Sequence, residues 1–155
     1  MNRGLLRDPG HLLALGFGSG LMRFAPGTFG TLAAIPLYLL LQSLPLVVYL
    51  IVIVLLFVLG VWICGRTARA LGVHDAPSIV WDEVVGYLLV MAAAPQGWGS
   101  VLLGFVLFRV FDIAKPWPIR WVDRRVTGGL GIMLDDLIAA IPAWLLLQLA
   151  THLLF

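Results

Sequence analysis

Acidic and basic side chains gather in a few short stretches of this chain, and their types suit phosphate chemistry at a metal ion. Residues 108–136 alone hold five of the ten basic residues and four of the eight acidic ones. Carboxylate oxygens are the ligands that Mg²⁺ prefers, and guanidinium and ammonium groups bind phosphate oxygens. The candidate metal ligands are Asp82, Glu83, Asp112, Asp135 and Asp136, and the basic candidates are Arg109, Lys115, Arg120, Arg124 and Arg125.

Two of these groups have structural explanations as well. Asp82 and Glu83 are adjacent, so on a helix they point about 100° apart and serve one site only if it lies between them. Alternatively, they are helix-start acids that complement the helix dipole. Arg109 and Asp112 are three residues apart and share a helix face. They are either site residues or a neutralising ion pair that lets a helix end enter a membrane, and both roles are compatible.

A second candidate phosphate-binding element lies near the N-terminus. It comprises Gly16-Phe-Gly-Ser-Gly20 and Ala25-Pro-Gly-Thr-Phe-Gly-Thr31. Neither segment is a dinucleotide fingerprint or a P-loop, because no Gly-Lys-Ser/Thr is present. Backbone N–H groups around Gly27 and Thr28 would form a phosphate nest ahead of a helix. Alternatively, the small residues only allow helices to pack closely.

Other catalytic residue sets are incomplete. Cys64 is followed by Arg66 and Arg69, which does not match the Cys-x5-Arg spacing of cysteine phosphatases, and the chain has no Asp-x-Asp. His74 beside Asp75 is either a proton shuttle or an ordinary polar loop pair. Direct attack on phosphorus by a metal-activated water is therefore the favoured mechanism.

The composition indicates a membrane protein with a single domain, residues 1–155. Hydrophobic residues make up 61% of the chain, charged residues only 12%, and the mean hydropathy is +1.03. Soluble domains usually carry about 25% charged residues. The net charge of +2 gives no reason to expect nucleic-acid binding. We expect an all-α, polytopic protein with about five membrane-embedded helices and short interfacial helices.

The uncharged runs predict where those helices lie. Residues 24–65 carry no charge. This run is too long for one span of about 20 residues, and Gln42-Ser-Leu-Pro45 breaks it. Residues 84–108 are also uncharged and are broken at 95–99, so their arms cross a bilayer only by continuing through the flanking charges. The expected segments are an interfacial or re-entrant piece at 11–22, a hairpin at 28–41 and 46–64, a second hairpin, and a last helix at 137–155.

The distribution of charge predicts the orientation. Both hairpin turns, 42–45 and 95–99, are uncharged, whereas the charges lie at the N-terminus, at Arg23 and in residues 66–83 and 109–136. With five spans, all charged segments fall on one face. Loops rich in Lys and Arg stay inside the cell, so that face is expected to be cytoplasmic and the C-terminus to lie on the far side.

Several motifs, taken in order, resemble the phosphatidylglycerophosphatase A family over residues 11–140. They are Gly16-Phe-Gly-Ser-Gly-Leu21, Ala25-Pro-Gly-Thr28, Gly72-Val-His-Asp75, Ile79-Val-Trp-Asp-Glu83, Phe111-Asp112, Lys115-Pro-Trp-Pro-Ile-Arg120, Asp123-Arg124 and Gly128-Gly-Leu-Gly-Ile-Met-Leu-Asp-Asp136. The resemblance implies a mainly helical, magnesium-dependent enzyme of the bacterial inner membrane. It would convert phosphatidylglycerophosphate into phosphatidylglycerol.

The residues and the resemblance together give one hypothesis for the site. Asp82, Glu83, Asp112 and Asp136 are expected to be catalytic metal ligands, with Asp135 in support. The phosphate would be bound by Arg109, Lys115, Arg124, Gly27 and Thr28. The sequence leaves open which carboxylate acts as a base, and it leaves the oligomeric state open. A small membrane transporter or scaffold with a buried charge cluster is the alternative function.

Overall fold

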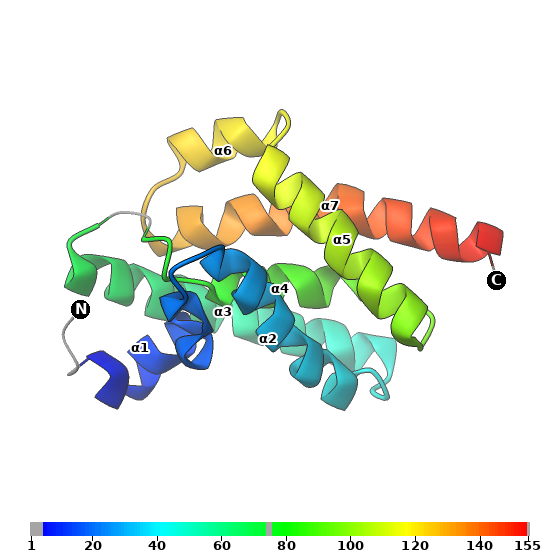
Figure 1. Cartoon of the computed structure of the whole chain (residues 1–155), viewed down its shortest axis with the longest axis horizontal. Coiled ribbons are helices and arrows are strands. Elements are labelled where there is room, and N and C mark those ends of the chain that lie inside the picture. Colours follow the sequence, from blue (N-terminus) through cyan, green and yellow to red (C-terminus); the bar gives the residue numbers. More distant parts are fainter. Residues whose placement is uncertain (1–4, 74–75, 155) are drawn as a thin grey trace.

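The computed structural model describes residues 5–73 and 76–154, and within these ranges the chain is helical without any strand. The expectation of an all-α protein is confirmed. The α-helices are α1 (Pro9–Ala14), α2 (Pro26–Leu41), α3 (Leu46–Leu71), α4 (Trp81–Val90), α5 (Trp98–Ala114), α6 (Ile119–Arg125) and α7 (Gly128–Leu154), and the 3₁₀ helices are η1 (Leu5–Arg7) and η2 (Gly16–Leu21). Both predicted hairpins are present, as α2–α3 and α4–α5 (Figure 1).

Helix α4 lies at the centre of the bundle, in contact with α2, α3, α5 and α7 (Figure 1). Eight of its ten residues are buried. A helix that is apolar on all sides is stable only where it is buried, in a packed core or in a bilayer, and from Val84 to Val90 the chain carries no charge. The acidic pair Asp82 and Glu83 in the first turn of α4 is therefore held in the interior by the apolar residues that follow it.

The last helix begins earlier than the sequence suggested. Helix α7 starts at Gly128 and not at Leu137, so Asp135 and Asp136 lie inside it and do not open it. The glycines at its start serve a turn and close packing: Gly128 adopts a left-handed φ of 75° where the chain enters the helix, and Gly129 packs against α3. A Cβ on Gly129 would collide with the carbonyl oxygen of Val61 and would lie 2.9 Å from the backbone nitrogen of Gly65, so α7 reaches the backbone of α3 only because this residue is glycine.

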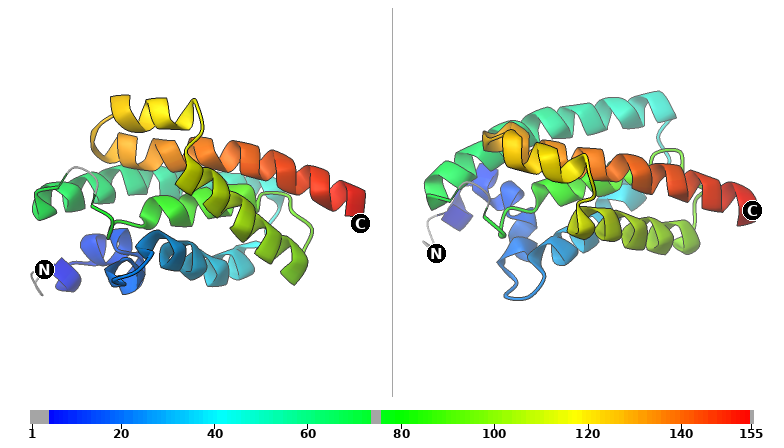
Figure 2. Two further views of the ribbon diagram at one scale, coloured as in Figure 1. Left: turned by 45° about the horizontal axis from the view of Figure 1, so that its top comes forward. Right: turned by 90° about the horizontal axis from the view of Figure 1, so that it is seen from above.

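The uncharged turns gather at one end of the molecule. The α2–α3 turn, the α4–α5 turn and the end of α7 lie at one end, and α1, the end of α3 and the α6–α7 connection lie toward the other (Figures 1 and 2). Gln96 joins the two turns by donating to the carbonyl oxygen of Gln42 at 3.2 Å. The two uncharged turns therefore lie together, and the predicted orientation of the charged segments toward the cytoplasm stays a prediction.

Two helices in the described ranges are long and apolar enough to cross a bilayer, at 46–71 and 128–153. Only 22% of the apolar window in α3 is buried within the protein, so most of this helix presents apolar side chains outward. The remaining helices are shorter: α2 has 16 residues, α4 has 10 and α5 has 17. The two long apolar helices fit a membrane association. The expected number of about five spans stays a prediction.

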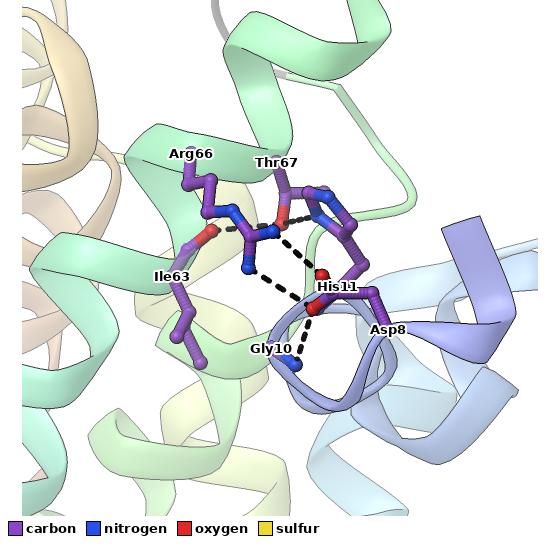
Figure 3. A network of polar contacts seen from close by, with 6 residues as sticks. All are labelled: Asp8, Gly10, His11, Ile63, Arg66 and Thr67. Atoms are coloured by element: carbon purple, nitrogen blue, oxygen red, sulfur yellow. Dashed lines mark hydrogen bonds and ion pairs between the residues drawn. The ribbon is translucent and has the colours of Figure 1, made fainter. Parts of the chain in front are cut away.

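The N-terminal segment is fixed to α3 by a polar network (Figure 3). Arg66 donates to both oxygens of Asp8, at 3.0 and 2.6 Å, and its hydrogen bond holds the pKa of Asp8 below its usual range. His11 Nδ1 lies 2.8 Å from Thr67 Oγ1, and the Thr67 hydroxyl donates to the carbonyl oxygen of Ile63. Because that hydroxyl has one proton, His11 is the donor in this pair. The segment at 11–22, which we expected to be interfacial or re-entrant, forms the end of α1 and the 3₁₀ helix η2. These two elements pack on α3 and α2.

Candidate active site

A cavity of about 340 Å³ lies where the start of α2, the start of α4, the end of α5 and the second and third turns of α7 meet. Its walls combine the small residues Ala25, Pro26 and Gly27 with the carboxylates of Asp82, Glu83, Asp112, Asp135 and Asp136 and the cations of Arg109 and Lys115. The fold thus brings together all five acidic candidates from three helices. It also brings Gly27, Arg109 and Lys115 to the same cavity.

Three of the carboxylates converge most closely. One oxygen from each of Asp82, Glu83 and Asp136 lies within 4.8 Å of the other two. Asp82 and Asp136 are buried, and Glu83 is nearly so. Asp112 and Asp135 are also buried and line the same cavity. Asp82 and Glu83 can serve one site, because an oxygen of each lies within 4.8 Å of the other and of an Asp136 oxygen, and all three residues line the same cavity.

The unsatisfied oxygens of these three residues fit a bound cation. Asp82 Oδ1, Glu83 Oε2 and Asp136 Oδ2 are buried and accept no hydrogen bond from any described residue. Buried carboxylates without partners are costly, because each loses its hydration and repels its neighbours. Hard oxygen donors of this kind suit a cation such as Mg²⁺, which binds one or two carboxylates together with water and phosphate oxygens. The cluster could therefore hold a metal ion.

Arg109 lies beside the carboxylates and faces the cavity. Its Nη1 forms an ion pair with Asp112 and lies 3.8 Å from Glu83 Oε1. The predicted neutralising pair of Arg109 and Asp112 is thus present, and it also belongs to the site. Arg109 Nε is buried without a hydrogen-bond partner in the described chain. The guanidinium therefore has donor capacity left for a ligand oxygen.

Lys115 forms a second charged element at the edge of the cavity. Its Nζ donates to Asp135 Oδ2 at 2.6 Å and to Asp123 Oδ1 at 2.9 Å. Partial burial by itself would lower the pKa of Lys115, but the hydrogen bonds to Asp135 and Asp123 outweigh it and raise the pKa. Lys115 is therefore a permanent cation that joins the end of α5 to α6 and α7.

The start of α2 approaches the carboxylates and Arg109 closely. Ala25 precedes the helix in the left-handed region, with φ of 46°, and directs the chain into α2. A Cβ on Gly27 would collide with Glu83 Oε1 and lie 3.1 Å from both terminal nitrogens of Arg109. Gly27 is therefore required by the packing of the site itself. The contact of Gly27 with Glu83 and Arg109 was not predicted from the sequence. The Ala25-Pro-Gly-Thr28 motif marked the segment but not its partners.

Other predicted residues lie elsewhere. Thr28 is not among the residues that line the cavity, and Arg124 lines a neighbouring pocket instead. Gly16 and Gly20 serve close packing: a Cβ on Gly16 would lie 2.6 Å from Val80 Cγ2, and one on Gly20 would collide with the segment before α4. His74 and Asp75 lie outside the described residues.

Comparison with known proteins identifies the family of this chain. Residues 12–151 match the family model described as Phosphatidylglycerophosphatase A. The Phosphatidylglycerophosphatase A of Escherichia coli K12 is 51% identical over 137 residues, which is 88% of this chain and 80% of the relative. The protein of the same name from Haemophilus influenzae is 51% identical over 140 residues, or 89% of this chain and 86% of the relative.

The chain belongs to the phosphatidylglycerophosphatase A family. It is therefore a phosphatase, as the sequence indicated. No solved structure matches it. The family match spans every helix that lines the cavity, from α2 to α7, so the carboxylates, Arg109 and Lys115 all lie within the matched region.

Proposed function

We propose that this protein is a Mg²⁺-dependent phosphatase that hydrolyses the terminal phosphomonoester of phosphatidylglycerophosphate, giving phosphatidylglycerol and phosphate for phospholipid biosynthesis. The names of two relatives at 51% identity support this substrate. The observation that carries the proposal is the set of three buried carboxylates with unsatisfied oxygens, from Asp82, Glu83 and Asp136, beside a guanidinium. This combination suits a metal ion and a phosphoryl group at adjacent positions.

Each part of the site has a role in this reaction. Asp82, Glu83 and Asp136 would hold the ion, with Asp112 and Asp135 beside them. Bound there, Mg²⁺ would polarise the phosphoryl group and activate a water for direct attack. Arg109, which Asp112 orients, would bind a phosphate oxygen and stabilise the charge that develops on it. Lys115 adds a fixed positive charge at the edge, and Gly27 leaves room for these groups to meet.

The membrane setting follows from the outer surface. Exposed apolar side chains cover α3, α5 and α7, including Leu55, Val106 and Leu145. The two hairpin turns carry no charge, and they lie together at one end of the bundle (Figure 2). We infer that the protein is a multi-pass protein of the bacterial inner membrane whose active site faces the cytoplasm. The acyl chains would then stay in the bilayer while the headgroup enters the cavity.

The transporter or scaffold alternative fits less well. Ionisable residues of an ion pathway are distributed through the depth of the membrane. Here five of the eight acidic residues line one cavity with Arg109 and Lys115, and the two hairpin turns carry no charge. A hydrolytic site at the level of the lipid headgroups accounts for this distribution.

The test is phosphate release by the protein purified in a neutral detergent. Phosphatidylglycerophosphate in mixed micelles is supplied with Mg²⁺ or with EDTA, and inorganic phosphate and the lipid product are measured together. We expect equal amounts of phosphate and phosphatidylglycerol, with Mg²⁺ only. Asp136→Asn, purified in parallel, controls for contaminating phosphatases. Absence of phosphate from the wild type, or equal release by the variant, would refute the proposal.

A further inference from the structure

A second cavity, of about 470 Å³, lies beside the active site between the end of α5 and α6. Its lining includes four cationic residues and no acidic one: Lys115, Arg120, Arg124 and Arg125, together with Trp117 and Trp121. Helix α6, which lines this basic pocket, lies along the first half of α7 (Figures 1 and 2), the half that contains Asp135 and Asp136. Its composition is that of an anion site.

The arginines of the basic pocket are not neutralised within the protein. Arg120, Arg124 and Arg125 form no ion pair with a carboxylate in the described part of the chain, whereas Arg109 pairs with two acids and Arg66 with one. Guanidinium groups bind phosphate oxygens through paired hydrogen bonds. Three such groups around one pocket therefore have donors available for a phosphate.

Two of these guanidinium groups are held against the pocket wall. Arg125 lies over the ring of Trp121, with its Cζ 5.3 Å from the ring centroid, which is a cation–π contact. Arg120 Nη2 lies 3.4 Å from the carbonyl oxygen of Ala114, the last residue of α5. A guanidinium that is already held in place loses less side-chain entropy when it binds a ligand.

Lys115 joins the basic pocket to the catalytic cavity. It is the one residue common to the two linings. Its ammonium group contacts Asp135, the neighbour of the metal-ligand candidate Asp136, and Asp123 of α6. One extended ligand could therefore place one phosphate in each cavity, on either side of Lys115.

The tryptophans indicate where such a ligand comes from. Trp117 is 83% exposed and Trp121 is 50% exposed, although both carry large apolar rings. Exposed tryptophans beside arginines are typical of the boundary between acyl chains and headgroups. A lipid whose chains lie beside these rings would present its first phosphate to the arginines.

We propose that the basic pocket binds the internal phosphodiester of the lipid substrate while the terminal phosphomonoester lies at the carboxylates. This inference rests on the proposed function, because it is the substrate with two phosphates on one glycerol that fills both cavities. No bond changes at the diester; Arg120 and Arg124 bind it and so position the monoester. The pocket would favour lipids that carry both groups over phosphatidate, which has a single phosphate.

The test compares the wild type with the double variant Arg120→Gln/Arg124→Gln in neutral detergent. The first quantity measured is kcat/KM for phosphatidylglycerophosphate. The second is the inhibition constant of short-chain phosphatidylglycerol, which carries only the diester. The third is the inhibition constant of inorganic phosphate, which resembles the monoester. In the double variant we expect kcat/KM to fall about tenfold or more and the phosphatidylglycerol inhibition constant to rise by a similar factor. The phosphate inhibition constant should change less than about twofold. Arg69→Gln, an exposed arginine of α3 outside both cavities, should leave all three unchanged.

Each other outcome overturns the inference in a distinguishable way. If phosphatidylglycerol inhibits without competing with the substrate, the pocket belongs to a separate bilayer lipid. If both inhibition constants rise together, the arginines act through the catalytic cavity or through the fold. A lowered melting temperature of the double variant would show that the fold is the cause. If the wild type releases no phosphate from phosphatidylglycerophosphate, the proposed function fails and this inference falls with it.

Discussion

Replacing Asp136 by asparagine should make the metal-free protein more stable while it abolishes activity. Asp136 is buried in α7 and shares the cluster with Asp82 and Glu83. Its Oδ2 accepts no hydrogen bond from any described residue. Without a cation these carboxylates repel one another, so the native state carries an electrostatic strain that the neutral amide removes without changing the shape of the side chain.

The size of the effect follows from the separation of the charges. Ligand oxygens of the cluster lie within 4.8 Å of one another. Two full charges at that distance repel by about 3.5 kcal/mol at an effective dielectric constant of about 20. Protonation of one group relieves part of this repulsion, so we expect the variant to gain about 2 kcal/mol. For a chain of this length that corresponds to an increase of about 4 to 8 °C in melting temperature.

The assay is thermal unfolding in neutral detergent, with EDTA or with saturating Mg²⁺. Mg²⁺ should raise the melting temperature of the wild type by mass action on the native state and should have little effect on the variant. Asp8→Asn is the matched control: its ion pair with Arg66 is partly exposed, so the change should lower stability slightly and leave the Mg²⁺ response intact. A metal-free Asp136→Asn protein that melts below the wild type and still responds to Mg²⁺ would refute this reasoning.

Three further predictions concern the packing, the thiol and the orientation. Gly27→Ala should lower turnover about tenfold or more with unchanged helicity, because its methyl group meets the site carboxylate and guanidinium, whereas Gly99→Ala adds a methyl in open space and should change neither. Cys64→Ser should keep most activity, since the thiol is buried outside the cavity; a hundredfold loss with folding intact would revive a thiol mechanism. In that background an impermeant thiol reagent on intact cells should label Gln96→Cys but not Arg124→Cys, and the reverse pattern would invert the topology.

Hydropathy and charge in the sequence were sufficient to predict much of the fold. The uncharged runs predicted both hairpins, because a long apolar run must be broken by residues such as Gln42 and Pro45. The length needed to cross a bilayer predicted that the two arms of the second hairpin continue through Asp82 and Arg109, and α4 and α5 do contain these residues. The five carboxylates were predicted to converge because a hard-ion site needs several oxygens, and they line one cavity.

The remaining features depend on contacts between segments far apart in the chain. Nothing local shows that Gly129 touches the backbone of α3, so the helical start of α7 before Leu137 was missed. The approach of Gly27 to Glu83 is likewise set by how α2 crosses α4. Arg124 was assigned to the same phosphate as Arg109, whereas α6 turns it into a separate pocket. Pattern gives the elements, but only packing decides which side chains share a cavity.

The most direct test is to measure divalent-cation binding and phosphate release on the same samples. Mn²⁺ bound to the purified protein is counted by electron paramagnetic resonance, with Mg²⁺ as competitor, for the wild type and for Asp82→Asn, whose carboxylate belongs to the cluster. We expect the wild type to bind Mn²⁺, Mg²⁺ to displace it, and binding and phosphate release to be lost together in the variant. Full phosphate release by the wild type in excess EDTA, or normal Mn²⁺ binding by an inactive Asp82→Asn protein, would contradict a metal-dependent reaction at these carboxylates.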